Sequence, residues 1–154
     1  MSVQTHVLME IDSLLSNASS IVFLENRVLS FEKDGWIYDK EADAQCTSEK
    51  LAHAGFFYSG AKSDRTSATC AFCLKEMNFD PTDDPWGEHV SHCPDCLFVK
   101  IGPKDQKDLS MREFMQLLAF RQCQQLLKLG ESLVINLSDA ADDVRENNKL
   151  PRRG

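Results

Sequence analysis

Cysteine and histidine residues cluster between residues 70 and 96, and their types and spacing are those of metal ligands. The cluster consists of Cys70, Cys73, His89, His92, Cys93 and Cys96. Thiolate sulfur and imidazole nitrogen are the donors that Zn²⁺ takes in tetrahedral sites, and a Cys-x2-Cys pair can grip one face of the ion from a tight turn. Four protein ligands leave no position for a reactive water. The spacing therefore predicts one structural zinc ion and argues against metal-dependent hydrolysis.

Two ligand sets are compatible with this spacing. The first, with three thiolates and one imidazole, is Cys70, Cys73, His89 and Cys96. The second replaces His89 by Cys93 and gives two Cys-x2-Cys pairs, as in zinc ribbons. An Asp-Pro pair at residues 84–85 predicts the start of a short helix that carries His89 inward, which favours the first set. Cys93 is then a spare thiol beside the site.

The surrounding pattern predicts short elements. Apolar residues at helical spacing predict a helix over residues 21–32, and a short helix over 47–53 ends at Gly55. A strand starts at Phe56, and a strand over 69–72 delivers the first two ligands. We expect an α+β fold, in which short helices surround a three-stranded antiparallel sheet and a long C-terminal helix follows. The expected divisions are a tail or short helix (1–20), a zinc domain (21–101), a linker (102–108), a helical segment (109–146) and a tail (147–154).

The start of the C-terminal helix is signalled by a capping box, Ser110 with Glu113, and by a hydrophobic staple, Leu109 with Phe114. Apolar residues then spread over more than one helix face, so more than one face must be covered. Packing on the zinc domain is one interpretation, and we favour a bundle with helices of other proteins. Gly130 is expected to kink or interrupt the helix.

Composition narrows the class of protein. The net charge is −7, and the segment from Asp80 to Glu88 holds acidic residues without basic ones. This disfavours direct binding to nucleic acid and suits a cationic partner, such as a basic peptide or a free amino terminus. Cysteine-rich sequence without a secretory signal predicts a reducing compartment, the cytoplasm or nucleus. We expect no membrane span, because no apolar run is long enough.

The sequence resembles the baculoviral IAP repeat (BIR) family. The residues that carry this resemblance are Arg27, Phe31, Trp36, Cys46, the Cys70-x2-Cys73 pair, Asp83-Asp84-Pro85-Trp86, Glu88-His89 and Cys96. The match is closest to the survivin-like branch, whose members have one BIR domain and a long C-terminal helix. One departure is the interval between Cys73 and His89, which is one residue shorter than is usual and has Phe79 in place of a family Trp.

The resemblance implies a groove for a peptide with a free N-terminal Ala. Asp83 and Glu88 would bind the amino group, and Phe79 would be the aromatic wall. Lys75 and His92 would share the phosphate of a phosphothreonine near the amino end of a histone tail.

The resemblance also implies a function, that of a non-enzymatic adaptor in a chromosomal passenger complex. Its C-terminal helix would join scaffold subunits and so localise a mitotic kinase at the centromere or kinetochore and at the spindle midzone, in support of chromosome segregation and cytokinesis. The residues expected to contact partner helices are Leu109, Phe114, Leu117 and Leu118. Inhibition of caspases, and hence of apoptosis, and a homodimer are further implications. The alternatives from other classes are a zinc-ribbon nucleic-acid binder and a thiol oxidoreductase.

Overall fold

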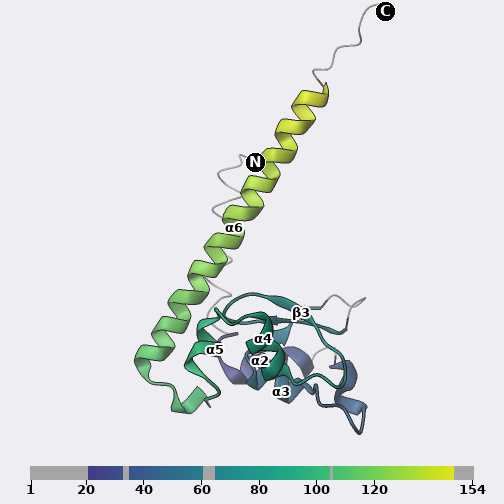
Figure 1. Cartoon of the computed structure of the whole chain (residues 1–154), viewed down its shortest axis with the longest axis vertical. Coiled ribbons are helices and arrows are strands. Elements are labelled where there is room, and N and C mark those ends of the chain that lie inside the picture. The colour runs from purple at the N-terminus through teal and green to yellow at the C-terminus, as the bar shows by residue number, and fades with distance from the viewer. Residues whose placement is uncertain (1–20, 33–34, 61–64, 105, 148–154) are drawn as a thin grey trace, which may run out of the picture.

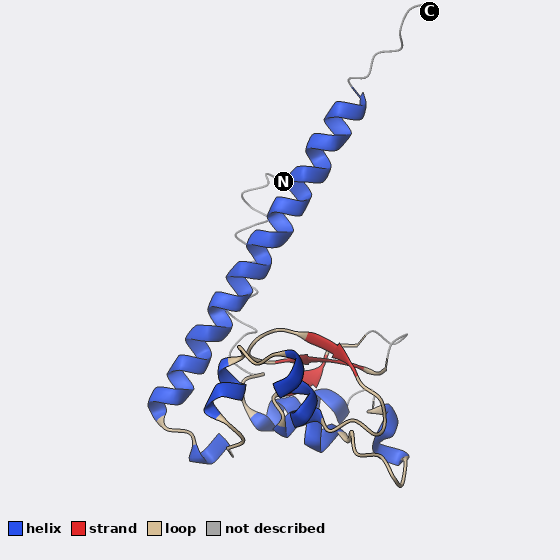
Figure 2. Cartoon of the chain, in the orientation of Figure 1, coloured by secondary structure: helices blue, strands red, loops and turns tan. Residues whose placement is uncertain are grey.

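The computed structural model describes residues 21–32, 35–60, 65–104 and 106–147. A three-stranded antiparallel sheet occupies the globular domain in the order β1 (Phe56–Tyr58), β2 (Ser67–Cys70) and β3 (Glu76–Asn78). The helices around it are α2 (Leu24–Glu32), η1 (Ile37–Lys40), α3 (Ser48–His53), α4 (Pro85–His92), α5 (Leu97–Ile101) and η2 (Gln106–Asp108). The long helix α6 (Met111–Asn147) projects beyond the domain (Figures 1 and 2). This arrangement confirms the predicted α+β fold. The tail or short helix predicted over 1–20 lies outside the described residues, as does the tail predicted over 147–154 except for Asn147, the last residue of α6.

The second strand starts two residues earlier than predicted and ends at Cys70. Its register pairs Cys70 with Phe56 of β1 and Ala68 with Met77 of β3. After Cys70 the chain turns back on itself, because the Leu74 N–H donates to the Cys70 carbonyl at 3.1 Å. We call residues 70–75 the cysteine turn. It carries two predicted ligands at the end of a strand whose described residues are all buried.

The core of the domain is largely aromatic, and its polar atoms are paired across long sequence distances. The indole N–H of Trp36 donates to the Cys46 carbonyl at 2.8 Å, and the Tyr38 hydroxyl donates to the Phe79 carbonyl at 2.9 Å. Such pairing removes the cost of burying an unpaired donor. The Trp36 bond closes the segment before α3 on itself, and the Tyr38 bond fixes that segment to the chain that leaves β3.

Helix α4 starts as the sequence predicts. Asp84 is the N-cap, and its carboxylate accepts from the Gly87 N–H at 2.9 Å, while Pro85 occupies the first turn. Proline suits this position because its missing N–H would have no partner there. The helix places His89 in the core, where it is fully buried.

Helix α6 also starts at the predicted capping box. The Glu113 N–H donates to Ser110 Oγ at 3.2 Å, and the Ser110 N–H donates to Glu113 Oε2 at 2.8 Å. Lys104 pairs with the same carboxylate, at 2.6 Å from Oε1. Hydrogen bonds from Lys104 and Ser110 lower the pKa of Glu113 to about 2. The linker is thereby tied to the first turn of the helix.

The predicted interruption at Gly130 is wrong, because α6 runs without a break from Met111 to Asn147. A single glycine inside a helix costs only about 1 kcal/mol relative to alanine, which is too little to end a helix that is held elsewhere. None of the described helices is both long and apolar enough to span a membrane.

The first half of α6 packs on the globular domain. Leu117 is fully buried, and the Phe114 ring lies 5.6 Å from that of Phe23, the residue just before α2. Beyond Gly130 the apolar side chains face solvent, with Val134 67% and Leu137 70% exposed. Packing on the zinc domain therefore covers one face of the helix, and a second apolar face stays uncovered.

Candidate metal centre

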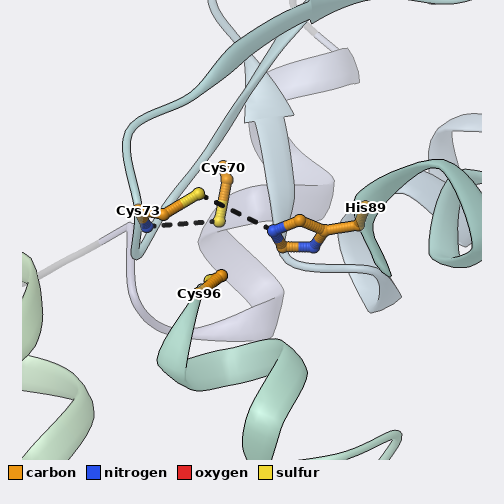
Figure 3. A group of neighbouring side chains, drawn as sticks. All are labelled: Cys70, Cys73, His89 and Cys96. Carbon is orange, nitrogen blue, oxygen red and sulfur yellow. Dashed lines mark hydrogen bonds between the residues drawn. The ribbon is translucent and has the colours of Figure 1, made fainter. Parts of the chain in front are cut away.

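Four of the predicted ligands converge on one point. One donor atom each from Cys70, Cys73, His89 and Cys96 lies within 4.8 Å of all the others. Figure 3 shows that Cys70 and Cys73 come from the cysteine turn, His89 from α4 and Cys96 from the start of α5. The distance from Cys73 Sγ to His89 Nε2 is 3.7 Å. In a tetrahedral zinc site, two ligand atoms lie roughly 3.5 to 3.8 Å apart, so this donor set fits one zinc ion.

The orientation of His89 is fixed by a second contact. Its Nδ1 lies 2.8 Å from the Ala54 carbonyl, which leaves Nε2 directed at the sulfur atoms. A carbonyl acceptor on the far nitrogen of a histidine ligand selects the tautomer that can bind metal. Rings of Phe56 and Phe98 flank the imidazole at 4.7 and 6.3 Å. These rings and the full burial of His89 shield the histidine side of the site from solvent.

The pKa values show how closely the donors are coupled. Burial raises the pKa of Cys70, whereas hydrogen bonds from Cys70 and Cys96 lower the pKa of Cys73. Burial acts to lower the pKa of His89, but hydrogen bonds to Cys73 and Cys96 outweigh it and raise that pKa to about 9. The opposite shifts show that the four donors interact directly with one another. Zn²⁺ would stabilise the thiolate form of the cysteines.

Cys93 lies beside the site but outside the four-residue group. Burial and the neighbouring Cys73 raise the pKa of its thiol to about 12. A thiol with so high a pKa is a poor nucleophile at neutral pH. The structure therefore favours the ligand set with His89 over the four-thiolate alternative.

Comparisons with known proteins agree with this geometry. The family model for the BIR, or Inhibitor of Apoptosis domain, matches residues 27–100. Chromosomal passenger complex protein bir-1 of Caenorhabditis elegans is 36% identical over 124 residues, which cover 80% of this chain and 76% of bir-1. The chain belongs to the BIR family. Its BIR domain binds one structural zinc ion through Cys70, Cys73, His89 and Cys96.

Other BIR relatives differ in how much of their length is shared. Baculoviral IAP repeat-containing protein bir-2 of C. elegans is 35% identical over 134 residues, 87% of this chain but only 41% of that protein. Mouse baculoviral IAP repeat-containing protein 5 is 37% identical over 76 residues, 49% of this chain and 54% of that protein. These matches and bir-1 confirm the resemblance to the survivin-like branch.

The BIR domain brings two of the predicted peptide-binding residues together. Lys75 and His92 line one cleft of about 310 Å³, and Phe120 and Gln124 of α6 also line it. The imidazole Nε2 of His92 lies 3.2 Å from a Glu88 carboxylate oxygen, one helical turn earlier. A lysine and a histidine that line the same cleft are side chains that can bind an anion.

The other predicted peptide-binding residues have different surroundings. Asp83 accepts a hydrogen bond from the Asp80 N–H at 2.7 Å, and neither Asp83 nor Glu88 is among the described residues that line the cleft. Phe79 is only 2% exposed, and its ring lies 5.1 Å from that of Phe56. The prediction of Phe79 as a groove wall is wrong, because the smaller ring of phenylalanine fits inside the core where it replaces tryptophan.

One of the predicted partner-helix residues, Leu117, is fully buried in the chain's own core and is not available to a partner helix. Leu109, Phe114 and Leu118 are half-buried against the same core, and their contact with partner helices stays a prediction. The exposed large apolar residues of α6 are Met111, Met115, Leu126, Leu127, Val134, Ile135, Leu137 and Val144.

Sequence reasoning missed a polar contact between α6 and the cysteine turn. Arg121 and Gln125 are 7% and 8% exposed, and Arg121 and Lys128 donate hydrogen bonds to the turn. The sequence spacing could have indicated this contact. Arg121, Gln125 and Lys128 continue the helix face that begins with Leu117 and Leu118, so they are expected to face the domain as well.

Proposed function

We propose that this chain is a non-enzymatic, zinc-dependent adaptor and a subunit of a chromosomal passenger complex. The observation that carries this proposal is a BIR domain followed by a long, unbroken helix with an uncovered apolar face. The similarity to bir-1, a protein named for that complex, supports it. In this function the chain connects a peptide-binding domain to scaffold subunits and thereby localises a mitotic kinase at centromeres and the spindle midzone.

The uncovered face has the pattern of a helix in a bundle. Leu126, Leu133 and Ala140 repeat at intervals of seven, as do Gly130, Leu137 and Val144. Leu127, Val134 and Ala141 lie beside this seam and widen it. An apolar stripe wider than a two-stranded seam is typical of a helix that packs against more than one partner helix. We propose that scaffold helices of the complex bind there.

This helix proposal is tested by assembly. Leu126→Glu and Leu137→Glu should each abolish co-elution of the zinc-loaded chain with scaffold-subunit helices in size-exclusion chromatography. Ser132→Glu is the matched control, because it adds the same charge to α6 at an exposed position outside the stripe. If all three variants assemble like the original chain, the proposed bundle is refuted.

The second part of the proposal is that the BIR domain reads a histone tail that begins with Ala and carries phosphothreonine. Support comes from the cleft, where Lys75 and His92 could share a phosphate dianion. Glu88 lies within 3.2 Å of His92, so a carboxylate for the peptide amine adjoins the phosphate position. Asp83 has one carboxylate oxygen that already accepts the Asp80 N–H, and the other can accept from the amine.

Fluorescence polarisation with labelled peptides that begin with Ala tests this proposed binding of a histone tail. Phosphorylation of the third residue should tighten binding, and Lys75→Ala or His92→Ala should remove the gain, while N-acetylation should weaken binding of either peptide. Lys40→Ala is the control, because Lys40 is exposed at the end of η1 and does not line the cleft. Equal affinity for both peptides would reject histone reading.

The family model is named for inhibition of apoptosis, which favours caspase inhibition as a second function. A purified caspase assay with and without the chain tests it directly. Nucleic-acid binding has less support, since the net charge is −7, and gel shifts at low salt would detect it. Thiol oxidoreduction is disfavoured because Cys70, Cys73 and Cys96, from both Cys-x2-Cys pairs, converge with His89 as one metal-donor set.

A further inference from the structure

Helix α6 holds both ends of the turn that carries two zinc ligands. A guanidinium N–H of Arg121 donates to the Ala71 carbonyl, and the Lys128 ammonium donates to the Leu74 carbonyl at 2.6 Å. Arg121 and Lys128 are seven residues apart and therefore lie on the same helix face. These carbonyls belong to the residues directly after Cys70 and Cys73. Helix α6 therefore contacts the residue that follows each ligand of the pair.

The cysteine turn has a conformation that needs support. Leu74 has a φ of +59°, which is uncommon for a residue with a side chain. Within the turn, the N–H groups of Phe72 and Cys73 point at Cys70 Sγ, at 3.3 and 3.4 Å. The peptide unit between Ala71 and Phe72 thus directs its N–H group toward Cys70 Sγ and its carbonyl toward α6. A change in one of these two contacts must alter the other.

The net charge of the zinc centre gives Arg121 a second role. Three thiolates and one Zn²⁺ leave a net negative charge of about one, and a buried charge needs a partner. Arg27 and Arg121 are 3% and 7% exposed, and the Cys70 sulfur acts electrostatically on both guanidinium groups. Arg27 is supplied by α2, within the BIR domain, whereas Arg121 is supplied by α6.

We propose that α6 is an outer shell of the zinc centre, with Arg121 and Lys128 as positioning residues that couple metal binding to docking of the helix. Zinc fixes the turn whose carbonyls hold α6, and α6 in turn stabilises the turn and the charge of its thiolates. Such coupling is reciprocal, so each event strengthens the other by the same factor. Phe120 and Gln124 share a cleft with Lys75 and His92, so docking of α6 also completes that cleft.

The test measures the rate at which full-length, zinc-loaded protein releases zinc to an excess of the chromogenic chelator 4-(2-pyridylazo)resorcinol. Arg121→Gln is expected to release zinc about tenfold faster, which is the usual scale for loss of an outer-shell partner, and Lys128→Gln also faster than the control. Arg112→Gln is that control, because Arg112 lies on α6 with an exposed side chain. Release within twofold of Arg112→Gln for both variants would overturn the proposal.

Two further variants separate charge from packing. Arg121→Lys keeps the charge and should restore slow release in part, whereas Arg121→Met keeps apolar volume and should not. Equal rates for these two variants would overturn the electrostatic part of the proposal. If Arg121→Gln does not fold, Lys128→Gln decides the outcome, because Lys128 lies at the exposed rim of the contact and its replacement leaves the core intact.

Discussion

Replacement of Leu117 by alanine tests whether α6 docks on its own BIR domain. Leu117 is fully buried against the core, so Leu117→Ala removes three buried carbon groups. At about 0.8 kcal/mol for each group, the transfer term is roughly 2.4 kcal/mol, and the cavity left behind adds to it. We therefore expect a loss of about 3 kcal/mol in the free energy of unfolding.

The matched control is Leu126→Ala, the same substitution nine residues further along the same helix. Leu126 is 60% exposed, so its replacement should change the free energy of unfolding by less than about 0.5 kcal/mol. Urea unfolding followed by circular dichroism, at one fixed concentration of free zinc, measures both values. Losses of the same small size for Leu117 and Leu126 would refute the docked position of α6.

Four other substitutions have clear expected outcomes. Cys96→Ser should abolish stoichiometric zinc binding, measured by metal analysis after dialysis, whereas Cys93→Ser should retain one zinc per chain because Cys93 is outside the ligand group. Gly130→Ala should stabilise the chain by up to about 1 kcal/mol in the same urea assay, since no atom lies within 4 Å of the added methyl group. Gly55→Ala should lower the melting temperature measured by calorimetry, because Gly55 has a φ of +94° and a methyl group would lie 2.9 Å from the Phe98 ring.

The parts of the fold that the sequence predicts well depend on local chemistry. The capping box of Ser110 and Glu113 and the Asp84 cap each act within one helical turn, so the residues that form them are neighbours in sequence. The zinc ligands Cys70 and Cys73 are local in the same sense. His89 was identified as a ligand because the helix cap before it sets the direction of its side chain.

The parts that were missed depend on contacts between distant segments. The resemblance predicts Phe79 as the aromatic wall of a groove, yet Phe79 is buried against the ring of Phe56 in β1, which is distant in sequence. Arg121 was not singled out at all, because its partner, the Ala71 carbonyl, is fifty residues away in sequence. An apolar stripe shows that a helix face is covered, and it does not show whether the same chain or another one covers it.

The continuity of α6 gives its docked half an effect on its exposed half. An isolated helix as short as residues 130–147 would be only marginally stable in water, because the first turn is costly to form. Leu117 and Arg121 hold the preceding turns on the BIR domain, so the exposed half extends a helix that already exists. Val134, Leu137 and Val144 are therefore presented in a preformed array, and a partner helix need not supply the free energy of ordering them. Any change that loosens the cysteine turn should therefore also weaken the binding of partner helices to the exposed half of α6, far from the zinc ion.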